Sequence, residues 1–130
     1  VGIDLATGRA LLAVQHGRPI TKHPDTGNDL ADIEIPHWER LLPLAAACYG
    51  VTGLGYLGVD IVLDHHLGPL IIELNARPGL AIQVASNAGL MPRLQNVDAL
   101  AEKHTDAFQR AEWSKQTFGV IGLSFPASES

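Results

Sequence analysis

The sequence predicts an α+β domain in which an antiparallel sheet carries its helices on one face. Two short runs with alternating apolar residues, 56–63 and 70–75, flank a turn-forming segment and are typical of a β-hairpin. Apolar residues recur at helical spacing from Pro36 to Tyr49 and again from Pro92 to about Phe118. The 130 residues are 46% hydrophobic and 18% charged, which is enough apolar material for one folded domain.

The first 22 residues are expected to form short strands joined by turns. The turns are predicted at Ala6-Thr7-Gly8 and at His16-Gly17, and residues 23–32, rich in Pro, Asp, Thr and Gly, are expected to form a loop. Because the chain opens in what reads as the middle of a strand, we expect it to be a piece of a longer protein.

The spacing of apolar residues and the positions of proline and glycine predict the helices. A helix is predicted from Pro36 through Tyr49, with Gly50 as its stop, and Cys48 lies on its apolar stripe as a buried, inert thiol. Pro43 lies inside this segment, so we expect a kink or a late start. Residues 81–88 predict a short helix, residues 92–118 a longer one, and residues 119–130 a poorly ordered tail.

Composition excludes several classes of function. Nine Lys and Arg against 14 Asp and Glu give a formal net charge of −5, and no basic cluster is present, which argues against nucleic-acid and membrane-surface binding. No apolar run approaches the roughly 20 residues of a membrane span. The single cysteine excludes an intramolecular disulfide, so we expect a reducing, cytoplasmic location.

The hairpin gathers acidic and amide side chains on one face. Alternation places Leu70, Ile72 and Leu74 in one row of the second strand and leaves Glu73 and Asn75 on the other face. If the loop closes with Leu63 opposite Leu70, then Asp60 lies directly opposite Glu73. We therefore expect Asp60, Glu73 and Asn75 to project together.

This arrangement favours a bound cation. Two opposed carboxylates at about 5 Å repel by roughly 3 kcal/mol at an effective dielectric constant near 20. Two carboxylates and an amide oxygen suit Mg²⁺ or Mn²⁺ better than zinc, and magnesium held by few protein ligands completes its shell with phosphates and water. Arg77 could add donors for a phosphate. The alternative is that Asp60 and Glu73 are solvated charges of an outer face.

The histidines named here are explained by turns at least as well as by metal binding or catalysis. His65 and His66 are expected at the exposed tip of the hairpin rather than as metal ligands, since the chain has no His-Glu-x-x-His spacing. His23 with Asp25 could form a base and its orienting partner, but a turn explains both residues equally well.

The motifs resemble the C-terminal end of an ATP-grasp domain. Gly58-Val59-Asp60-Ile61 is followed by Glu73-Leu74-Asn75-Ala76-Arg77-Pro78-Gly79-Leu80, and the opening residues 2–9 and the stretch 23–27 are also similar to the α-L-glutamate ligase-like members, relatives of the ribosomal-protein glutamate ligase. The resemblance implies that residues 1–118 are the C-terminal portion, or half, of an ATP-grasp fold.

The resemblance also implies an activity. An ATP- and Mg²⁺-dependent carboxylate–amine ligase phosphorylates a carboxylate of an amino acid or peptide, and an amine then attacks the acyl phosphate. The family positions matched by Asp60, Glu73 and Asn75 hold magnesium (or manganese) and thereby the ATP phosphates, and Arg77 is assigned to the transferring phosphate. The lysines and phosphate loop of the nucleotide clamp are not recognisable, so the chain is expected to be inactive alone.

Two rival functions remain at this point. The first is a non-catalytic binding or interaction domain that keeps the ATP-grasp fold. The second is a metal-dependent phosphohydrolase, which needs further carboxylates on the same face, with Asp4 as the candidate. A homo-oligomer is also left open, because an uncovered sheet edge can pair with a second copy.

Overall fold

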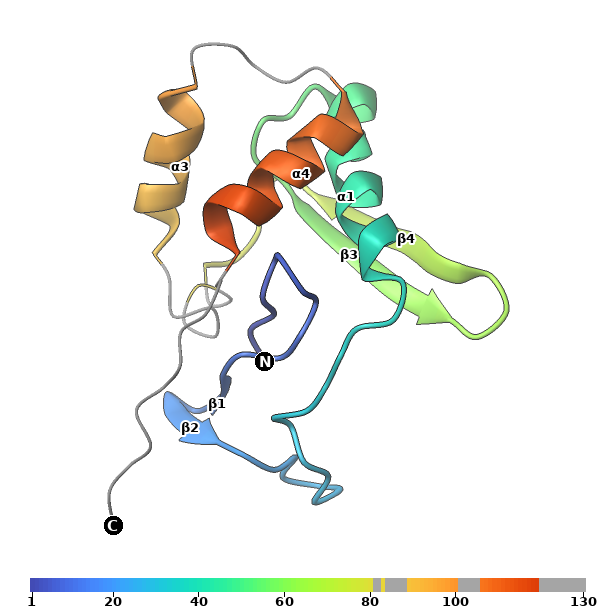
Figure 1. The fold of residues 1–130 in the computed structure, drawn as a ribbon, viewed down its shortest axis with the longest axis vertical. Coiled ribbons are helices and arrows are strands. Elements are labelled where there is room, and N and C mark those ends of the chain that lie inside the picture. The colour runs from blue at the N-terminus through green and yellow to red at the C-terminus, as the bar shows by residue number, and fades with distance from the viewer. Residues whose placement is uncertain (81–82, 84–88, 101–105, 120–130) are drawn as a thin grey trace.

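The computed structural model describes residues 1–80, 83, 89–100 and 106–119, and it confirms the α+β class (Figure 1). The elements follow in the order β1 (Ala13–Gln15), β2 (Arg18–Ile20), α1 (Trp38–Thr52), β3 (Gly58–Asp64), β4 (Gly68–Asn75), α3 (Leu90–Asp98) and α4 (Ala107–Phe118). The strands form two separate two-stranded antiparallel sheets, β1-β2 and β3-β4, where one sheet was expected. Strands β1 and β2 have three residues each and pair with each other.

The N-terminal segment forms the predicted turns. His16 and Gly17, with φ of 49° and 77°, connect β1 to β2. Two consecutive residues with positive φ are the pattern of the hairpin turn whose twist matches its strands. An isolated bridge joins Ile3 to Ala10 around the Ala6-Thr7-Gly8 turn. This segment lies beside the lower ends of α1 and α4 in the view of Figure 1.

Helix α1 differs from the prediction at both ends. It begins at Trp38 rather than Pro36, and Pro43 still lies inside it, in the second turn. It continues through Gly50 and ends at Gly53, which adopts φ 70° and donates its N–H to the Tyr49 carbonyl. Gly53 supplies the left-handed conformation of a helix C-terminus, whereas Gly50 remains helical.

The predicted long helix over residues 92–118 is wrong. Helix α3 ends at Asp98, and a separate helix α4 begins after Asp106. The Asp106 carboxylate accepts hydrogen bonds from the N–H groups of Phe108 and Gln109 at 2.8 and 3.1 Å, which is a typical N-cap. The predicted helix over residues 81–88 and the tail beyond Gly119 lie outside the described residues.

Helices α1 and α4 contact each other, and Cys48 of α1, 4% exposed, is buried as predicted. The Arg110 guanidinium reaches from α4 to α1, donating to the Ala46 carbonyl at 3.1 Å and lying over the Tyr49 ring at 5.1 Å. The buried apolar residues are Ala13, Leu30, Leu41, Cys48 and Ala111. No helix among the described residues is long and apolar enough to cross a membrane.

Candidate metal site on the β3–β4 hairpin

The hairpin register confirms the predicted acid pair. Asp60 pairs directly with Glu73, and Asn75 pairs with Gly58 one step along the same face. The expected contact between Leu63 and Leu70 is wrong, because Leu63 pairs with Pro69 instead. The pairs near the tip, from Ile61 onward, are shifted by one residue relative to the pairs that include Asp60 and Glu73.

A β-bulge accounts for this difference. Asp60 pairs with Glu73 and the next residue, Ile61, pairs with Ile71, which leaves Ile72 without a partner across the ladder. A bulge of this kind inserts one residue into one strand and bends that strand locally. Ile72 is 65% exposed, whereas its neighbour Ile71 is partly buried.

The bulge also corrects the predicted faces of β4. Val59 and Ile61 of β3 share a face with Ile71, and all three residues are partly buried. The single row of Leu70, Ile72 and Leu74 is therefore interrupted. The opposite face carries the exposed carboxylates of Asp60 and Glu73.

The loop after β4 supports the acidic face. The Asn75 side-chain oxygen accepts a hydrogen bond from the Arg77 N–H at 2.9 Å, which turns the chain immediately after the strand. Pro78 then packs over Gly58, where an added Cβ would lie 2.9 Å from the Pro78 Cβ. Gly58 and Pro78 thus close one end of the face, a role that the sequence reasoning did not assign to them.

The donor set suits a hard cation. Asp60 and Glu73 have no hydrogen-bond or ion-pair partner among the described residues, so their oxygens are available. No group of three His, Cys, Asp or Glu side chains gathers in the described part of the chain. Two carboxylates, with one amide oxygen that keeps a second lone pair, fit magnesium completed by water and phosphate rather than a zinc site built from protein ligands.

The tip of the hairpin is a turn, as expected. The Asp64 carboxylate accepts the N–H groups of His66 and Leu67, both at 2.8 Å, and these bonds from Leu67 and His66 hold its pKa below 3.8. His65 and His66 are exposed, and their rings meet edge to face at 4.9 Å. The Asp64 carboxylate therefore stabilises the turn, although Asp64 lies on the same strand as Asp60.

Two further candidates have structural roles. The His23 Nδ1 accepts the N–H groups of Asp25 and Thr26, both at 3.3 Å, so His23 closes the predicted turn. Asp4 is 4% exposed and accepts the Thr7 hydroxyl at 2.6 Å within its own turn. Asp4 therefore adds no carboxylate to the hairpin face, which removes the support for a phosphohydrolase.

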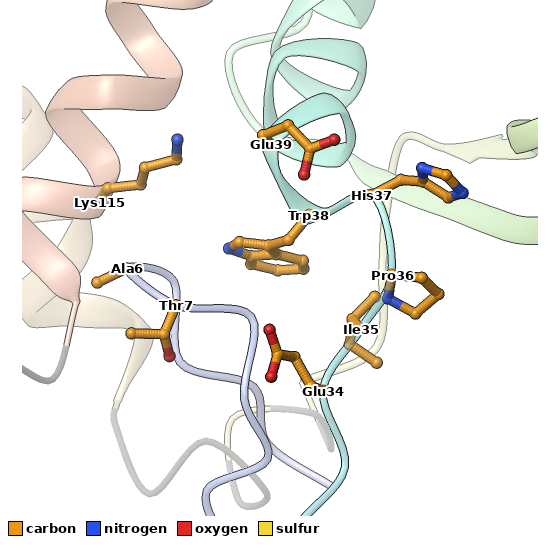
Figure 2. Close-up of a pocket in the computed structure, with 9 residues that line it drawn as sticks. All are labelled: Ala6, Thr7, Glu34, Ile35, Pro36, His37, Trp38, Glu39 and Lys115. Carbon is orange, nitrogen blue, oxygen red and sulfur yellow. The ribbon is translucent and has the colours of Figure 1, made fainter.

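A cavity of about 510 Å³ lies apart from this face, between the N-terminal turn, the start of α1 and the end of α4 (Figure 2). The Trp38 indole N–H donates to the Leu5 carbonyl at 3.0 Å and so fixes the ring in the wall. The sequence reasoning missed this cavity because its three segments are far apart along the chain. Its lining residues are Ala6, Thr7, Glu34, Ile35, Pro36, His37, Trp38, Glu39 and Lys115.

The described chain is an α+β structure that carries a paired-carboxylate hairpin, and a comparison with known families gives the class of protein to which it belongs. Residues 1–99 match the family of sugar-transfer associated ATP-grasp proteins. The chain belongs to this family. The matched region contains the complete β3–β4 hairpin and α1.

Curated relatives point in the same direction. The chain is 39% identical over 77 residues to a probable alpha-L-glutamate ligase of Alcanivorax borkumensis, covering 56% of this chain and 24% of that protein. Proteins of the same name from Stutzerimonas stutzeri and Legionella pneumophila are 44% and 33% identical over 42% and 52% of this chain and 17% and 22% of theirs. The chain thus matches about a quarter or less of their length. No solved structure matches significantly.

Proposed function

We propose that the chain supplies the metal-binding part of an ATP- and Mg²⁺-dependent carboxylate–amine ligase, and that residues 1–118 are the C-terminal portion of its ATP-grasp domain. Family membership and the names of the glutamate ligase relatives support the class of reaction. The observation that carries the proposal is the direct pairing of Asp60 with Glu73 on an exposed face. The substrates proposed are ATP, a carboxylate of an amino acid or peptide, and an amine.

The acidic face explains how this chain serves phosphoryl transfer. Asp60, Glu73 and Asn75 would hold magnesium, which when bound neutralises charge along the ATP phosphates. The β-ladder fixes Asp60 and Glu73 opposite each other, so the two carboxylates need little rearrangement to share one cation. Because both are exposed, the cation keeps positions for water and phosphate oxygens.

Arg77 has the role of binding the transferred group. Its backbone is anchored by the bond to Asn75, so the guanidinium starts two residues from the metal ligands. The planar fork of an arginine suits a phosphate or an acyl phosphate, whose formation leaves ADP and activates the carboxylate toward the amine. Attack by the amine then forms the amide and releases phosphate.

The experiment is calorimetric titration of the protein with Mg²⁺, with and without ATP. We expect Asp60→Asn and Glu73→Gln to abolish magnesium binding, whereas Asp32→Asn, an exposed carboxylate outside the hairpin, leaves it unchanged. Equal binding by all variants would favour a non-catalytic interaction domain. A coupled ADP assay should show no turnover by this chain alone, since the nucleotide clamp is not recognisable in it.

A further inference from the structure

The cavity beside Trp38 is a second place where the structure collects binding groups. It lies at the first turn of α1, whereas Asp60 and Glu73 lie on the β3–β4 hairpin and do not line it. Its volume of about 510 Å³ is within the range of roughly 300–1,000 Å³ of small-molecule pockets. The proposed metal chemistry therefore does not explain it.

The wall of the cavity combines an aromatic ring with negative charge. Figure 2 shows the indole ring of Trp38 between the carboxylates of Glu39 and Glu34. The ring cannot swing away easily, because its N–H bonds the Leu5 carbonyl and its base packs on Gly8, where even a Cβ would lie 2.5 Å from the Trp38 Cγ. An aromatic ring flanked by carboxylates attracts an ammonium group through cation–π and charge interactions.

Two cationic side chains near the cavity each have a carboxylate partner. Lys115, whose side chain is 20% exposed, reaches in from α4 but bonds the Glu112 carboxylate at 2.6 Å. Glu34 shares its charge with Arg9 at 3.4 Å. Among the described residues, Glu39 has no such partner, so the cavity retains a net negative character at the ring.

We propose that this cavity binds a ligand carrying a primary ammonium group, such as a free amino acid, a peptide amino terminus or a lysine side chain. The ammonium lies against the Trp38 ring and bonds the Glu39 carboxylate, and the apolar part of the ligand contacts Ile35. This site is independent of the metal site, so either can fail experimentally without the other.

The test uses glycinamide as the probe and the two indole N–H signals in a nitrogen-15 NMR spectrum as the readout. Trp38 reports on the cavity, and Trp113, which packs on Phe118 and is not part of the lining, is the internal control. Trp38→Phe assigns the signals. We expect glycinamide to shift the Trp38 signal saturably without moving Trp113, and N-acetylglycinamide, which lacks the charge, to move neither.

Variants identify the carboxylate that binds. Glu39→Gln should weaken glycinamide binding on the order of fivefold, the scale of an exposed ion pair. Asp32→Asn removes the same charge outside the cavity and should have no effect. If Glu39→Gln disturbs the Trp113 signal, showing misfolding, Glu34→Gln replaces it, with a smaller loss expected because Arg9 shares that charge.

Three results would overturn the proposal. The first is equal response to glycinamide and N-acetylglycinamide, which would mean that charge is not recognised. The second is a saturable Trp38 shift with inorganic phosphate in place of glycinamide, which would make the cavity an anion site. The third is unchanged binding in both glutamate variants.

Discussion

Replacing Asp60 by asparagine should have opposite effects on stability with and without magnesium. In the absence of metal, Asp60 and Glu73 face each other across the ladder, and opposed side chains start about 5 Å apart at Cβ. Both residues are exposed, so water screens the pair and the repulsion is about 1 kcal/mol rather than the 3 kcal/mol of a lower dielectric. Removing one charge at constant shape should therefore stabilise the metal-free protein by up to that amount.

In the presence of magnesium, the wild-type protein should be more stable than the Asp60→Asn variant. With about 10 mM Mg²⁺ and a dissociation constant of about 1 mM, binding stabilises the wild-type fold by about 1.4 kcal/mol, and Asp60→Asn gains none of it. Thermal unfolding in EDTA and in Mg²⁺ measures both effects, and 1 kcal/mol corresponds to about 4 °C for a chain of this size. About 1 M NaCl should remove the advantage of the variant in EDTA by screening.

Asp32→Asn is the matched control, since it removes an exposed carboxylate outside the hairpin and should show neither effect. The reasoning would be refuted if Asp60→Asn failed to stabilise the protein in EDTA, or if it kept the full response to Mg²⁺.

Three further predictions concern the fold. Gly8→Ala should lower the free energy of unfolding by about 2 kcal/mol or more, because φ is +76° and the new Cβ meets Trp38. Gly27→Ala, at φ +71° with nothing within 4 Å, should lower it by only about 1 kcal/mol through backbone strain. Urea unfolding compares the two variants, and equal losses would contradict the tight packing at Gly8. Asp106→Ala should destabilise α4 by about 1 kcal/mol and Asp106→Asn by much less, as measured by circular dichroism, since only alanine loses the cap. The hydrogen bonds from the Leu67 and His66 N–H groups lower the pKa of Asp64 in the folded protein. They therefore stabilise the fold above the unfolded pKa near 3.8, and this stabilisation is lost as pH falls through the folded pKa. NMR titration should give a pKa below 3.8, and Asp64→Asn should remove this part of the dependence of stability on acid pH.

The acid pair was predictable because strand alternation is a local property. The wrong pairing of Leu63 with Leu70 and the correct pairing of Asp60 with Glu73 came from the same assumed register, and the bulge at Ile72 separates them. Nothing about an isoleucine within an apolar run indicates a bulge, since its backbone needs no glycine there.

The helix boundaries show a different limit. Apolar spacing continued through residues 92–118 and predicted one helix, although Asp106 is a recognisable capping residue. Aspartate also occurs inside helices, so Asp106 by itself does not mark a helix start. The cavity beside Trp38 could not be predicted at all, because it forms only where the end of α4, the start of α1 and the N-terminal turn come together.

The bulge at Ile72 separates the pairing register of the hairpin tip from the register of the acid pair. The turn from Asp64 to Gly68 fixes the pairing of the tip, and the unpaired residue then absorbs one position before the ladder reaches Asp60 and Glu73. Without this shift, the register of the tip would place Ile72 opposite Asp60 and would turn Glu73 to the other face. Deleting Ile72 alone would remove the bulge and bring Glu73 opposite Asp60 in the register of the tip.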